Sequence, residues 1–100
     1  MSKRVFIERH ACMVWISIDE RGSLLLTGQD LDPGTLGVDE YEYFITVSPE
    51  HFDAIRAALD APPDSDVIDV MCANAEKIFL TGETTWLKEH GIPYGFSNYF

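Results

Sequence analysis

The spacing of the apolar residues changes near residue 47, and this change limits the folds open to the chain. Residues 39–47 alternate between two kinds of side chain, as a half-buried β-strand does. One face of this strand holds Tyr41, Tyr43, Ile45 and Val47, and the other holds Glu40, Glu42, Phe44 and Thr46. After residue 47 apolar residues recur every three or four positions, which predicts amphipathic helices. The chain therefore begins with strands and continues with helices.

Three more strands are expected before residue 39. Residues 5–18 are rich in β-branched and aromatic side chains but too long for one ordinary strand, so we expect two strands divided near residues 9–10. Residues 20–23 predict a turn, in which Gly22 is free to adopt a positive φ. Residues 24–29 then form the returning strand of a hairpin, and residues 30–38 predict a loop.

Start and stop signals divide the second half into helices. Ser48 and Pro49 predict the start of the first helix, which two consecutive prolines end. The next helix begins after a cap supplied by Asp64, Ser65 or Asp66, and its apolar stripe consists of Val67, Ile68, Met71, Cys72, Ala75 and Phe79. A third helix is expected at residues 83–90, ended by Gly91, before a last strand at residues 94–100.

This order, ββββαααβ, predicts an α+β fold in a single domain spanning residues 1–100. Strands followed by helices favour an antiparallel sheet, here of four to five strands, with two to three helices packed on one face. No repeat or linker divides the chain, and its length suits one hydrophobic core. No apolar stretch is long enough to cross a membrane and no signal peptide is recognisable, so we expect a cytoplasmic protein with reduced Cys12 and Cys72.

Negative charge is concentrated in the middle of the chain. The net charge is −10. Eleven carboxylates lie between residues 30 and 69, where Arg56 is the only Lys or Arg. They are Asp30, Asp32, Asp39, Glu40, Glu42, Glu50, Asp53, Asp60, Asp64, Asp66 and Asp69. Such a charge distribution favours a basic partner and disfavours nucleic acid and anionic membranes.

Part of this acidic stretch has a structural explanation. Glu50 and one of Asp64 and Asp66 fall at helix starts, where negative charge suits the helix dipole. Asp53, Asp60 and Asp69 fit solvated helix faces. The acids of the loop and the exposed strand face are left, with an aromatic residue at their edge. The predicted partner-binding residues are therefore Asp30, Asp32, Asp39, Glu40, Glu42 and Phe44.

No motif predicts catalysis, a metal site or a cofactor. Residues 30–34 resemble the start of a calcium loop, but Gly34, Thr35 and Tyr41 occupy positions where a calcium loop needs an oxygen ligand, Gly and Glu. The three histidines show no paired ligand spacing. Nucleophile elbows, Cys-x-x-Cys pairs and phosphate-binding loops are absent from the sequence. We therefore expect a protein that is not an enzyme and takes no cofactor or metal.

The chain resembles small acidic bacterial immunity proteins. Three segments are similar to bacterial proteins of this length: Gly28-Gln29-Asp30-Leu31, Asp39-Glu40-Tyr41-Glu42-Tyr43 and Glu89-His90-Gly91-Ile92-Pro93-Tyr94. Length, acidity and the lack of a catalytic motif agree with the same resemblance. Immunity proteins of contact-dependent inhibition and other polymorphic toxin systems protect a cell from a toxin delivered by its neighbours. The resemblance implies a non-catalytic inhibitor of a cognate, basic, nuclease-type toxin, and it carries no site residues over.

Two alternatives stay open at the level of sequence. One is a small ligand-binding domain or enzyme with a pocket between sheet and helices, for which Tyr41, Tyr43, Trp86 and His90 are the best residues. The other is a regulatory oligomerisation module, in which the strand at residues 94–100 pairs across a sheet edge. The sequence alone leaves the oligomeric state, the toxin's chemistry and the mode of inhibition open.

Overall fold

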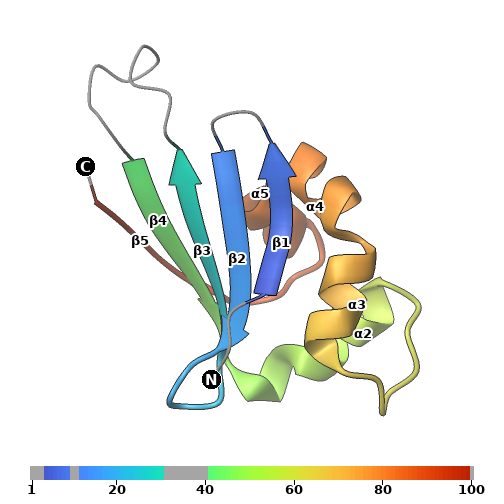
Figure 1. Cartoon of the computed structure of the whole chain (residues 1–100). Coiled ribbons are helices and arrows are strands. Elements are labelled where there is room, and N and C mark those ends of the chain that lie inside the picture. The colour runs from blue at the N-terminus through green and yellow to red at the C-terminus, as the bar shows by residue number, and fades with distance from the viewer. Residues whose placement is uncertain (1–3, 10–11, 31–40, 100) are drawn as a thin grey trace.

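The computed structural model describes residues 4–9, 12–30 and 41–99, and its elements follow the predicted order. The strands are β1 (Arg4–Arg9), β2 (Cys12–Ile18), β3 (Leu24–Asp30), β4 (Tyr41–Val47) and β5 (Gly95–Tyr99). Between β4 and β5 lie the 3-10 helix η1 (Pro49–His51) and the helices α2 (Phe52–Ala58), α3 (Val67–Ala73), α4 (Ala75–Thr81) and α5 (Glu83–Glu89). The fold is α+β, as predicted (Figure 1).

The five strands form one antiparallel sheet in the order β1-β2-β3-β4-β5. The helices gather on one side of it, with α3 and α4 against β1 (Figure 1). Alternate strand residues point to that side and are at most 2% exposed: Val14, Ile16, Leu24, Leu26, Ile45 and Val47. They pack with apolar side chains of the helices, Ile55, Met71, Ile78, Trp86 and Leu87 among them. The predicted alternation of β4 is thereby confirmed from residue 42 onward.

The turn between β2 and β3 forms where the sequence predicted it. Gly22 has a φ of +80°, in the region that favours glycine. The Asp19 carboxylate accepts hydrogen bonds from the backbone N–H groups of Arg21 (2.8 Å) and Ser23 (2.9 Å). This Asx-type arrangement fixes the hairpin and so the register of β2 against β3.

The predicted helix after residue 64 is two helices, so the expectation of two to three helices was wrong. Asp66 caps α3, because its carboxylate accepts hydrogen bonds from Ile68 N (2.8 Å) and Asp69 N (3.3 Å). Asn74 then leaves the helical region, with φ −118° and ψ 18°, and its side-chain amide donates to Val70 O at 2.9 Å. An Asn side chain that bonds to the backbone offers an alternative to the helix ladder, which explains the break.

The end of α5 returns the chain to the sheet. Gly91 has a φ of +67°, Gly91 N donates to Lys88 O at 3.1 Å, and Ile92 N donates to Leu87 O at 2.9 Å. These two bonds make a Schellman motif, which the glycine predicted. Ile92 is 2% exposed, so it anchors the connection to the core immediately before β5.

Candidate functional site

The sheet face that turns away from the helices holds the candidate site, and we call it the open face. Strand register places the following side chains on it: Val5, Glu8, Met13, Trp15, Ser17, Leu25, Thr27, Gln29, Glu42, Phe44, Thr46 and Ser97. The four α-helices of the described chain all lie on the other side (Figure 1). The open face is therefore the side of the sheet that a partner reaches without displacing a helix.

A central row of residues crosses all five strands of the open face. Successive register pairs connect Val5 on β1, Trp15 on β2, Thr27 on β3, Phe44 on β4 and Ser97 on β5. Thr27 is only 8% exposed although no described helix covers it. Its neighbours in the row, Trp15 and Phe44, are half-buried large side chains, and they account for this cover. The two aromatic residues stand roughly 10 Å apart, which is two strand spacings.

Carboxylates lie at one end of the open face. The row beside the central one contains Glu8, Met13, Gln29 and Glu42. Asp30 pairs with Tyr41, so residues 31–40 leave and re-enter the sheet at this same end. Residues 30–42 hold five carboxylates and no Lys or Arg. No Lys or Arg of the described ranges falls on the open face, so its electrostatic character is negative.

The predicted partner-binding residues have different outcomes. Glu42 and Phe44 lie two positions apart on β4, both half-buried on the open face, as the alternation predicted. Asp30 is the last residue of β3, where its backbone pairs with Cys12 and Tyr41. Three of the predicted residues, Asp32, Asp39 and Glu40, lie outside the described residues. The structure thus places one predicted acid and the predicted aromatic residue on the same surface.

Sequence reasoning missed the second aromatic residue of this surface. It did not place Trp15 among the partner-binding residues, but register puts Trp15 on the open face, in one row with Phe44. A signal was present. In residues 12–18 the aliphatic Val14, Ile16 and Ile18 alternate with Met13, Trp15 and Ser17, so period two separates the two sets.

Three acids on the helical side, Asp53, Asp66 and Asp69, have structural partners. Arg4 Nη1 donates a hydrogen bond to the Asp69 carboxylate at 2.5 Å, and this hydrogen bond raises the pKa of the Arg4 guanidinium. Asp53 accepts a hydrogen bond from Arg56 Nη1 at 2.8 Å, while Arg56 Nε donates to Ser65 O at 2.7 Å. Together with the Asp66 cap, these contacts explain much of the helical charge through folding. Glu8 and Glu42, the described acids of the open face, are a separate group.

The residues named for an enzyme contribute to packing. The Tyr43 hydroxyl donates to a Glu83 carboxylate oxygen at 2.5 Å, and Glu83 is 8% exposed. Trp86 is 2% exposed, and its ring lies 4.7 Å from the His90 ring, centre to centre. The Tyr41 side chain lies outside the description. Tyr43 thus joins the sheet to α5, whereas Trp86 lies in the core and the exposed His90 ring lies against it at the end of α5. The buried Glu83 was not anticipated.

Cys72 shows no sign of an activated nucleophile. Its thiol is free and half-buried in α3. Burial raises the pKa of the Cys72 thiol, and the nearby Arg4 charge opposes that shift. A raised pKa reduces the thiolate fraction, which is the reactive form. The predicted role as a core cysteine agrees with this environment.

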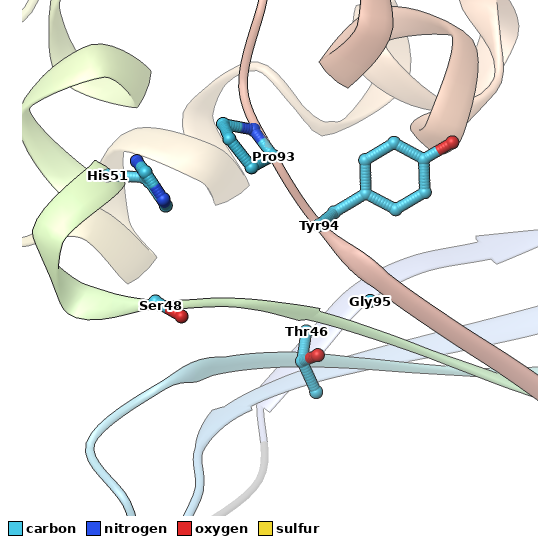
Figure 2. A pocket seen from close by; sticks show the side chains of 6 residues that line it. All are labelled: Thr46, Ser48, His51, Pro93, Tyr94 and Gly95. Atoms are coloured by element: carbon cyan, nitrogen blue, oxygen red, sulfur yellow. The ribbon is translucent and has the colours of Figure 1, made fainter.

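A pocket of about 350 Å³ opens where β4 meets the connection from α5 to β5 (Figure 2). Its lining comprises Thr46, Ser48, His51, Pro93, Tyr94 and Gly95. Figure 2 shows the Tyr94 hydroxyl pointing away from His51, so these polar groups do not converge on one point as a catalytic site requires. The pocket contains none of the residues predicted for an enzyme.

Metal ligands and membrane spans were searched for in the same described residues. No group of three or more His, Cys, Asp or Glu side chains there is arranged to hold a metal ion. No helix of these ranges is both long and apolar enough to cross a bilayer. Comparison with known proteins gives the chain no relative, because no protein-family model, curated protein or solved structure matches it.

Proposed function

We propose that this protein is a non-catalytic, cytoplasmic immunity protein that binds and neutralises a basic, nuclease-type bacterial toxin. One observation carries the proposal: Glu42 and Phe44 share the open face with Trp15, and the sequence directly before Glu42, residues 30–41, holds four more carboxylates and no Lys or Arg. Among the described residues this surface shows no catalytic constellation. It combines aromatic side chains with one sign of charge, which are features of protein–protein recognition.

The central row of the open face, with Trp15 and Phe44, is the part of the surface suited to tight binding. Binding energy in interfaces concentrates in a few residues, with Trp enriched among them, surrounded by polar residues that exclude water. Trp15 and Phe44 lie near the middle of the sheet, and Glu8 and Glu42 lie in the adjacent row. Because every strand of the row is paired in register, the side chains are held on a preorganised scaffold.

The acidic end supplies steering toward a basic partner. A nuclease must present a positive cleft to its substrate, and a negative surface accelerates encounter with such a cleft. The proposed contact places the carboxylates of residues 30–42 against Lys and Arg of the toxin. The acids on the helical side, which are bonded to Arg4 and Arg56, have no part in this contact.

Co-purification with the toxin domain tests the proposal. The proposal predicts that a neighbouring gene encodes a large secreted protein, and the C-terminal domain of that protein is the probe. Binding at low salt that inhibits the toxin's activity is the expected result. If the two proteins do not bind even at low salt, where ion pairs are strongest, the proposal is wrong.

Charge variants then locate the surface. Glu42→Gln is expected to lower the association rate constant severalfold at low salt, and less at high salt, since screening removes steering. Asp64→Asn is the matched control, because it removes the same charge from an exposed site in the α2–α3 connection. Equal effects of the two substitutions would contradict a specific role for the open face.

A further inference from the structure

The two edges of the sheet are protected to different degrees. On β1, Arg4 and Glu8 are charged and exposed, a bulge interrupts the register between Val5 and Ile7, and α3 and α4 pack alongside. The exposed charges, the bulge and the flanking helices hinder the addition of another strand at the β1 edge. The β5 edge has none of them: Gly95–Tyr99 contains no charge and no proline, and its pairing with β4 is regular.

We propose that β5 pairs antiparallel with β5 of a second copy of this chain, giving a two-fold symmetric dimer with one continuous sheet. Within the described residues β5 has a neighbour on one side only, so its other side presents unpaired backbone groups. Antiparallel pairing of identical strands satisfies the symmetry of a dimer, because each strand plays the same role toward the other.

The lack of charged residues on β5 favours this strand for self-association. Most surfaces of a chain with net charge −10 repel their own copy when brought into contact. Five consecutive uncharged residues along an edge, three of them exposed at Gly95, Phe96 and Ser97, allow close approach without ion pairs. Toward a basic partner, by contrast, a neutral edge offers no electrostatic gain. The edge therefore fits a second copy better than it fits the toxin.

An exposed aromatic side chain on the same strand supports this choice. Phe96 is 50% exposed, although its ring is stacked near Tyr43, with 6.1 Å between ring centres. A strand added beside β5 brings new side chains against Phe96 and removes apolar surface from water. Pairing centred on Ser97 also continues the central row of the open face into the row of the second copy. The dimer would then present both open faces on one side.

Sedimentation velocity on the full chain, over a range of protein and NaCl concentrations, tests this inference. The expected result is a monomer–dimer equilibrium that shifts toward dimer as NaCl rises from about 0.05 to about 0.5 M, because salt screens the repulsion between acidic copies. Toxin binding has the opposite salt dependence, so the two proposals fail independently. A chain that stays monomeric at every concentration and salt level overturns the inference and leaves the edge to a strand from another protein.

Three substitutions localise the contact. Ser97→Lys and Phe96→Lys place charge on the edge and are expected to weaken dimerisation about tenfold or more. Ala73→Lys, at an exposed site at the end of α3, changes the net charge equally and is expected to leave the dimer intact. Circular dichroism checks that each variant is folded. Phe96→Lys also removes the ring contact with Tyr43; if that loss unfolds the protein, Ser97→Lys still tests the contact. A dimer unaffected by Ser97→Lys would refute pairing through β5.

Discussion

The two faces of the sheet are built from the same strands but differ in side-chain composition and burial. The face under the helices is aliphatic and closely packed, with Val14, Ile16 and Leu26 at most 1% exposed. The open face is mixed: Trp15, Glu42 and Phe44 are half-buried on it, beside buried hydroxyl side chains and the apolar Val5, Met13 and Leu25. Packing explains the first set of residues. The second set is not required by the helices, and the proposed function accounts for its composition through contact with a partner.

The largest stability effect is expected on the covered face, and adjacent residues of β2 test the contrast. Ile16→Ala should lower the free energy of unfolding by about 3 kcal/mol, since it leaves a cavity at a site that is fully buried. Trp15→Ser, one position away on the open face, should cost less than half as much but abolish tight toxin binding. Urea unfolding measures the stability of the two variants, and a binding assay measures their affinity for the toxin domain. If Trp15→Ser lowers the free energy of unfolding more than Ile16→Ala does, the assignment of Ile16 to the packed face and Trp15 to the binding face is wrong.

The next largest stability effect is expected on the covered face at Gly28 of β3, which lies directly under the Tyr43 ring of β4. A Cβ atom added at Gly28 would clash with the Tyr43 ring, so Gly28→Ala must displace the ring and its bond to Glu83. We expect a loss of about 2 kcal/mol in unfolding free energy.

A double-mutant cycle checks that cause. In a Tyr43→Ala background the same Gly28→Ala change should cost less than about 0.5 kcal/mol, because the clashing ring is gone. Additive losses in the cycle would show that the ring is not the source of the penalty.

The smallest expected effect separates the two groups of acids. Asp66→Ala should lower the free energy of unfolding by about 1 kcal/mol, because two backbone N–H groups at the start of α3 lose their acceptor. Asp64→Ala, two positions earlier, should change it by less than about 0.5 kcal/mol. Neither change should alter toxin affinity. Thermal unfolding together with a binding assay tests this, and weaker binding by Asp66→Ala at unchanged stability would count against a purely structural role.

Local rules predicted most of the fold. Period-two alternation gave the two faces of β4, and turn chemistry gave the bend at Gly22 and the end of α5 at Gly91. The break at Asn74 was missed because apolar spacing continues across it, and Asn costs little more than other polar residues inside a helix. Local hydrogen bonding of the Asn side chain decided the outcome there.

The candidate site was harder to predict, because it depends on register between strands. The sequence places Glu42 and Phe44 on one face, but the row that joins Phe44 to Trp15 through Thr27 follows from pairing among three strands. Glu83 was missed for a similar reason: its hydroxyl donor, Tyr43, is forty residues away in sequence. No local pattern contains such information.

The two tryptophans allow the most direct test of the open face as the binding surface. Trp15 lies on the open face and Trp86 lies in the core at 2% exposure, so each gives one indole N–H signal in a nitrogen-15 spectrum. Titration with the toxin domain should shift or broaden the Trp15 signal and leave the Trp86 signal in place. Selective assignment by Trp15→Phe identifies the two peaks. An unchanged Trp15 signal in a saturated complex would contradict the account.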